Sequence, residues 1–200
     1  KWSRNVILVD GDYVDSVAFD LTVNFERMLG RRINKADTAR WIDCIALDGG
    51  MREGRDSDGE TQVIFIHSKD KQQLDNFNPG SYESNLNAMA FKDSLGEFII
   101  SSYPVEEVVK HDDFFLDILK TVVNHKDVHR VMAIPNAEHP ALWDALRRDN
   151  PFAISSAFTN SFTSSDLGRI VFEAVVLPAP LHPDITYNCG IVLRYLLLIK

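Results

Sequence analysis

Cysteine is scarce in this sequence, with only Cys44 and Cys189 among 200 residues. The two are far apart and lack the spacing of metal ligands, which argues against a disulfide framework or a structural zinc site. We therefore expect reduced thiols and a cytoplasmic protein. Long apolar runs are also missing: the tail at 191–199 has about half of the roughly 18 residues that a membrane span needs, and Arg194 interrupts it. No membrane partner is expected.

Positive charge is in the minority. Lysine and arginine number 21 against 29 aspartate and glutamate residues, which gives a formal net charge of −8. This balance opposes indiscriminate binding to nucleic acids or anionic membranes. The phosphate-binding loop, the dinucleotide-binding glycine pattern and the serine nucleophile elbow are absent, and the histidines show no zinc spacing on one helix. The candidates for chemistry are therefore acidic residues.

The composition is that of an ordinary globular chain, with 45% hydrophobic and 25% charged residues. Short apolar runs predict strands at 6–9, 62–67, 97–102, 130–134 and 152–158, and periodic apolar residues predict helices at 14–29, 36–48, 84–95, 111–123 and 140–148. This alternation predicts an α/β fold, a three-layer sandwich with a mainly parallel sheet of about five strands. We expect it to occupy residues 1–160, with residues 161–200 as an irregular C-terminal extension packed on the same domain.

Local signals refine these elements. Gly30 is expected to stop the first helix, because glycine commonly ends helices. Asn34 and Asp112 are expected to be helix N-caps, and Pro104 is expected to break the third strand. The polar loop that follows the second helix contains Asp56, and we expect its replacement to leave any catalytic activity unchanged.

The most informative stretch is an aliphatic run that ends in Asp10-Gly11-Asp12, after which a helix pattern begins at once. Residues two apart in a strand point to the same side, so both carboxylates can face one point beyond the sheet. Ligands of open α/β sheets bind at that edge, and a hard divalent cation relieves the repulsion between two carboxylates. The alternative is that Asp12 caps the helix and Asp10 is a solvated strand end.

Further polar side chains are expected at the same edge. Asp113 and Asp117 are four residues apart and share one face of their helix, and Asn136 and Glu138 lie in the turn after the fourth strand. Oxygen ligands on three strand–helix turns suit Mg²⁺ or Mn²⁺. The candidate metal ligands are therefore Asp10, Asp12, Asp113, Asp117, Asn136 and Glu138. The alternative is that Asp113 complements the helix dipole and Asp117 is solvated.

The order of these motifs resembles the NYN branch of the PIN-like nuclease fold over about residues 5–158. Asp10-Gly11-Asp12-Tyr13 is similar to the family's Asp-Gly-Asp-Asn opening, and Asp113 and Asp117 match acids on its central helix. The turn after the fourth strand departs from the family's Ser-Gly-Asp-x-Asp-Phe pattern, because asparagine replaces the first acid and only Glu138 remains.

The resemblance implies a metal-dependent ribonuclease that uses Mg²⁺ or Mn²⁺, acts on RNA and has Asp10, Asp113 and Asp117 as catalytic residues. Because some relatives have lost acids and activity, it also implies an alternative, an inactive PIN-like binding or structural module. The chain resembles, in addition, an uncharacterised bacterial family that shares this opening and the DDFFL helix. Neither the oligomeric state nor the role of the extension follows from the sequence.

A second family is a competing match. Asp10-Gly11-Asp12-Tyr13-Val14 is similar to the opening of haloacid-dehalogenase-like phosphatases, which implies Asp10 as nucleophile and Asp12 as general acid. His67-Ser68 is similar to the second motif of that family. The acidic pair that those enzymes carry after the fourth strand is missing, because Pro135-Asn136 stands there. We therefore favour the PIN-like hypothesis over the phosphatase hypothesis.

Overall fold

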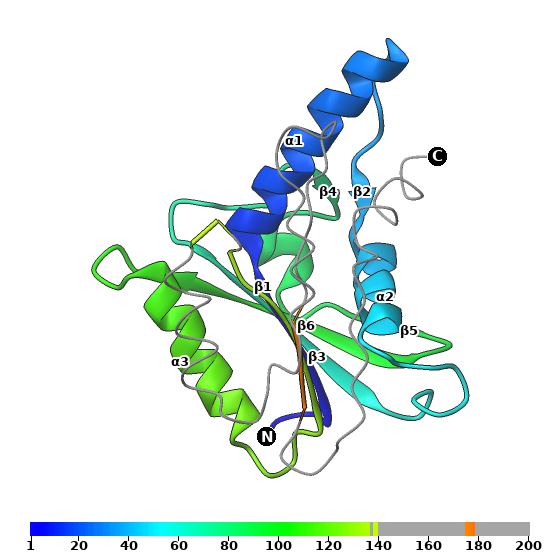
Figure 1. The fold of residues 1–200 in the computed structure, drawn as a ribbon, viewed down its shortest axis with the longest axis vertical. Helices are drawn as coiled ribbons and strands as arrows, with labels where there is room; N and C mark the ends of the chain where they lie inside the picture. The colour runs from blue at the N-terminus through cyan, green and yellow to red at the C-terminus, as the bar shows by residue number, and fades with distance from the viewer. Residues whose placement is uncertain (137, 140–174, 179–200) are drawn as a thin grey trace.

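A computed structural model describes residues 1–136, 138–139 and 175–178. Within these residues the chain forms an α/β structure in which helices cover both faces of a sheet (Figure 1). The helices are α1 (Gly11–Leu29), α2 (Thr38–Asp48) and α3 (His111–Val123), with a short π-helix, η1, at Tyr82–Leu86. None of the described helices is long and apolar enough to cross a membrane.

The described part of the main sheet has six strands in the order β5-β6-β3-β1-β7-β8. Their bounds are β1 (Asn5–Asp10), β3 (Glu60–Ser68), β5 (Ala90–Asp93), β6 (Gly96–Val105), β7 (Arg130–Ile134) and β8 (Val175–Pro178), and a separate pair is formed by β2 (Ala36–Asp37) and β4 (Phe77–Asn78). The pairings β6–β3, β3–β1 and β1–β7 are parallel, whereas β5 and β8 join the two edges antiparallel. The sheet is therefore mixed, which corrects the prediction of a mainly parallel sheet.

Strand β1 separates two apolar cores, because its side chains alternate between the faces of the sheet. Ile7 and Val9 pack with apolar residues of α1 and α2, whereas Val6 and Leu8 pack with those of α3. Figure 1 shows α2 and α3 on opposite sides of the strands. With both faces covered, β1 is buried along its whole length, and ligands can reach it at its ends.

Several predicted elements are confirmed with small shifts. The first four predicted strands correspond to β1, β3, β6 and β7, and the helix at 111–123 matches α3. Gly30 ends α1 in the left-handed region, with φ of 66°, and its N–H donates to the carbonyl of Glu26. Met51 is buried, as expected for the one apolar residue at the start of the polar loop. These are the elements with the strongest apolar periodicity.

Two other predictions are wrong: the helix at 84–95 and the break of the third strand at Pro104. The expected helix at 84–95 is η1 followed by strand β5, which forms a hairpin with β6 through Ser94 and Leu95. Pro104 does not break β6, because β5 pairs with β6 only as far as Ile99 and a proline is tolerated at the open edge beyond it.

Two predicted N-caps are also corrected. Helix α2 is capped by Asp37, whose carboxylate accepts from the N–H of Arg40, and not by Asn34. Helix α3 begins after Lys110 without a side-chain cap, so Asp112 lies inside its first turn.

The remaining predictions concern residues outside the described part. The strand at 152–158 and the helix at 140–148 lie there, as do the boundary at residue 160 and most of the extension. From 161–200, the described residues are those of β8, which pairs with β7.

Candidate functional site

Asp10 lies at the carboxyl end of β1, in the middle of the sheet, and is buried. It is also the N-cap of α1, because one of its carboxylate oxygens accepts a hydrogen bond of 3.0 Å from the N–H of Tyr13. This reverses the alternative in which Asp12 would be the cap and Asp10 a solvated strand end. Strand β1 thus runs into α1 with no loop between them, and this junction fixes Asp10 at the sheet edge.

Asp12 follows in the first turn of α1 and is held by the end of the neighbouring strand. Its Oδ2 accepts from the backbone N–H of Ser68 at 2.9 Å and from the Ser68 hydroxyl. Its Oδ1 is buried and has no hydrogen-bond partner among the residues that the structure describes. A buried carboxylate oxygen without a donor is costly and calls for an explanation such as an ion or a bound water.

His111, the first residue of α3, lies between the two carboxylates. Its Nε2 is 3.3 Å from Oδ2 of Asp10, and its Nδ1 is 3.7 Å from Oδ2 of Asp12. Burial lowers the pKa of His111, but the contact with Asp10 and the charges of Asp10, Asp12 and Asp112 outweigh it and raise the pKa above its ordinary value. When it is protonated, this imidazole supplies a positive charge to the two carboxylates that it contacts.

Tyr82 and His67 form the wall of the site beside Gly11. Their rings are stacked, with centroids 3.7 Å apart and planes 7° apart. Burial lowers the pKa of His67, so this ring is neutral at pH 7. Burial, together with the charges of Asp12, Asp15 and Asp10, raises the pKa of Tyr82, whose hydroxyl stays protonated. The site thus combines two carboxylates and one cationic imidazole with a neutral aromatic wall.

Gly11→Ala is expected to destabilise the protein by about 1–3 kcal/mol through overpacking. A Cβ at this position would lie 2.3 Å from the Tyr82 hydroxyl oxygen and 3.3 Å from the carbonyl oxygen of Ile66. Tyr82 is buried and stacked, so its hydroxyl has little freedom to move away.

Chemical denaturation of the single and double variants measures this clash. Tyr82→Phe should recover most of the loss caused by Gly11→Ala, so that the double-mutant cycle is strongly non-additive. Ser16→Ala, at an exposed position of the same helix, is the control and should be neutral or slightly stabilising. Additive losses from Gly11→Ala and Tyr82→Phe would show that the Tyr82 hydroxyl does not exclude a side chain at position 11.

The structure does not bring the other predicted ligands into this centre. Asp113 and Asp117 are exposed, because they lie on the face of α3 away from the buried Phe115 and Leu119. Glu138 is exposed, and its N–H donates to the side chain of Asn136 within the turn.

The described residues contain no group of three or more His, Cys, Asp or Glu side chains arranged to hold a metal ion. The six-ligand set expected from the sequence is therefore not assembled here. Asp10 and Asp12 both lie near one side chain from α3, that of His111, and each is close to a different nitrogen of its ring. Asp112, the expected cap, is instead 2.7 Å from His139, which links α3 to the turn after β7.

The helical period of the sequence indicates His111 at this site, whereas the spacing of the acids does not. His111 lies four residues before Phe115 and eight before Leu119, so the helical period places it on the buried face of α3. The acids Asp112 and Asp113 cannot share that face. Ser68 had a signal as well, because it comes directly after the run at 62–67 that forms most of β3, the neighbour of β1 in the sheet.

Comparison with known proteins adds a family but no activity. A family model described as a family of unknown function (DUF6621) matches residues 1–150. No curated protein and no solved structure matches the chain. The matched range includes Asp10, Asp12, Ser68 and His111, so the whole centre lies within the family's sequence.

Proposed function

We propose a function from the site itself, because the chain belongs to DUF6621, a family of unknown function. The proposal is a PIN-like domain that binds Mg²⁺ or Mn²⁺ at Asp10 and Asp12 and hydrolyses phosphodiester bonds of RNA. The observation that carries it is the position of both carboxylates at the junction of β1 and α1 beside His111, with Oδ1 of Asp12 buried and without a donor among the described residues. The cytoplasmic location remains a prediction.

Two carboxylates are enough for this class of cation. Magnesium keeps several of its waters and is bound in many enzymes by one or two carboxylates together with substrate phosphates. A bound cation would activate water and stabilise the leaving oxygen of a phosphodiester. Asp10 and Asp12 would hold the cation, and Ser68 would keep the Asp12 carboxylate oriented through its N–H and hydroxyl. His111 balances the carboxylate charges in the absence of a cation.

Manganese-dependent cleavage of single-stranded RNA tests this proposal. Asp10→Asn should reduce cleavage roughly 100-fold or more, because it removes a charge at the reacting centre. Its fold should be kept, since asparagine caps helices as well as aspartate does. Asp113→Asn is the matched control: its side chain is exposed, so cleavage should persist. Equal cleavage by wild type and Asp10→Asn would assign the activity to a contaminant or to another site.

A second candidate is the phosphatase hypothesis, which the position of Ser68 favours. Ser68 ends the strand next to β1, and its N–H and hydroxyl both point to the Asp12 carboxylate. In this scheme Asp10 is the nucleophile and Asp12 the general acid. Hydrolysis of p-nitrophenyl phosphate that is lost in Asp10→Asn, without cleavage of RNA, would support it over the nuclease.

The module alternative rests on His111. Its imidazolium lies where the two carboxylates converge and compensates their charge without any added cation. A protein that ignores manganese, yet depends on His111 for stability, would be a binding or structural module.

A further inference from the structure

Four arginines lie near the amino ends of the parallel strands, whereas Asp10 lies at the carboxyl end of β1. Arg4 precedes β1 and Arg130 begins β7, while Arg52 and Arg55 belong to the loop between α2 and β3. The carbonyl of Arg4 accepts from the N–H of Arg130 at 3.2 Å, so the two strands hold these residues side by side. We call these four residues the arginine cluster. Its position makes it independent of the proposed cation site.

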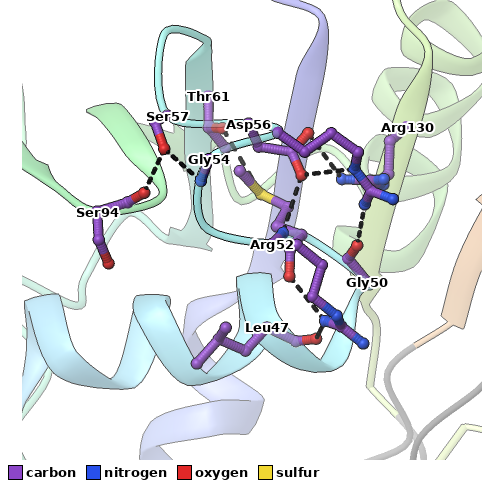
Figure 2. Close-up of polar contacts among 11 residues, drawn as sticks. Leu47, Gly50, Arg52, Gly54, Asp56, Ser57, Thr61, Ser94 and Arg130 are labelled. Carbon is purple, nitrogen blue, oxygen red and sulfur yellow. Dashed lines mark hydrogen bonds and ion pairs between the residues drawn. The ribbon is translucent and has the colours of Figure 1, made fainter.

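One carboxylate faces the arginine cluster. Oδ2 of Asp56 accepts hydrogen bonds from the backbone N–H of Arg52 at 2.9 Å and from the side-chain Nε of Arg55 at 3.3 Å. Oδ1 of Asp56 lies 3.6 Å from Nη1 of Arg130. Figure 2 shows Arg130 beside the Asp56 carboxylate, whereas the Arg52 side chain extends to the carbonyl of Leu47 and contacts Asp56 through its backbone N–H alone.

The other hydrogen bonds of the arginine cluster go to uncharged carbonyl groups, so they do not neutralise its positive charge. Arg52 donates to the carbonyls of Leu47 and Met51, and Arg55 donates to that of Gly50. These carbonyls satisfy donors at the end of α2 but carry no net charge. The cluster therefore retains an excess of positive charge in a chain whose formal net charge is −8.

Arg130 is the member of the arginine cluster that has a buried donor without a hydrogen bond to any described residue. Its Nη1 is buried and has no hydrogen-bond acceptor within the described part of the chain, although the Asp56 carboxylate is near. Burial lowers the pKa of Arg130; Asp56 opposes this effect, and the charges of Arg55, Arg4 and Arg52 add to it. A buried guanidinium donor among other guanidinium groups is satisfied best by an oxyanion, which accepts several charge-assisted hydrogen bonds at once.

We infer that the arginine cluster is an anion site that takes a phosphate group beside Asp56. Arginine suits this ligand because its planar fork matches two phosphate oxygens. The side chain of Arg55 is 60% exposed and that of Arg130 is 23% exposed, so a ligand can arrive from solvent and reach the buried end of the cluster. The phosphate group is either free or part of a nucleic-acid backbone, and the experiment separates these sources.

Isothermal titration with inorganic phosphate in EDTA tests the site. Wild type should bind phosphate with a dissociation constant of about 1 mM, well above the noise of the method. Arg130→Gln should weaken binding at least tenfold, and the exposed Arg55→Gln, which is safe for folding, should weaken it about threefold. Arg32→Gln is the matched control, because Arg32 is exposed and pairs with Glu26 beyond the end of α1.

A short single-stranded RNA then identifies the source. Tighter binding of RNA than of phosphate, lost in Arg130→Gln, supports a backbone phosphate. Phosphate binding that RNA does not compete with supports a free anion. The inference is overturned if wild type and both arginine variants bind phosphate equally. It is also overturned if wild type shows no binding up to about 20 mM, since such a site would contribute less than about 2.5 kcal/mol.

Discussion

Asp56→Ala is expected to lower the free energy of unfolding by about 3 kcal/mol, which corresponds to a fall of about 6–12 °C in melting temperature. The Asp56 carboxylate receives the N–H of Arg52 and the guanidinium of Arg55, and it is the acid next to the buried nitrogen of Arg130. Its removal leaves Arg130 without a nearby carboxylate. The sequence alone predicts no effect of replacing Asp56 on cleavage of RNA, and the structure adds this expected effect on stability.

Thermal melting of three further variants tests this explanation. Asp58→Ala is the matched control: it lies in the same loop, is exposed and should change stability by less than about 0.5 kcal/mol. Adding Arg130→Met to Asp56→Ala should restore part of the loss, because an apolar side chain no longer needs a counter-charge. Arg130→Met alone should cost less than Asp56→Ala alone. Equal melting temperatures for Asp56→Ala and Asp58→Ala would contradict a stabilising role of this carboxylate.

His111→Gln is expected to destabilise the protein by about 2–3 kcal/mol at pH 5.5 and by less than about 1 kcal/mol at pH 9, in EDTA. The folded pKa of His111 is raised above its unfolded value. Its stabilising contribution is therefore complete below the unfolded pKa and is lost as the pH rises through the folded pKa. Urea unfolding at a series of pH values gives the difference between wild type and variant directly.

Comparison with the variant is needed because Asp43 titrates in an overlapping range. Burial, with contributions from Asp93 and Glu53, raises the pKa of Asp43 to about 7. Its contribution to stability is thus also lost with rising pH, between the unfolded and folded pKa values. Both proteins carry Asp43, so its contribution cancels in the difference between the free energies of unfolding of wild type and His111→Gln. A difference between wild type and His111→Gln that stays constant with pH would refute the imidazolium bridge.

The parts of the fold that could be predicted are those that local pattern alone determines. A buried parallel strand reads as an uninterrupted aliphatic run, as in 6–9, and an amphipathic helix as a regular period, as in α3. Strand β5 is short, half-exposed and stabilised by its pairing with β6, so it carries no comparable pattern. The mixed sheet depends on such edge strands, and their direction follows from hairpin contacts that the sequence period does not encode.

The candidate site was predictable to the same extent. Asp10 and Asp12 were identified because they follow one aliphatic run, but only Asp10 ends the strand, and Asp12 lies in the first turn of α1. Asp113 was favoured for its charge, although the helical period turns it away from the core and turns His111 toward it. The arginine cluster joins three segments far apart in sequence, and no local pattern indicates such a contact.

The melting temperature in manganese tests the central claim most directly, which is that Asp10 and Asp12 hold a divalent cation. At a free concentration of about 100 times the dissociation constant, binding to the folded state contributes roughly 2.7 kcal/mol. For a chain of this size, wild type should therefore melt about 5–10 °C higher with manganese than with EDTA. Asp10→Asn should abolish most of that rise, and Asp113→Asn should keep it. A wild-type curve that millimolar manganese leaves unchanged would contradict the cation site and favour the module that His111 completes.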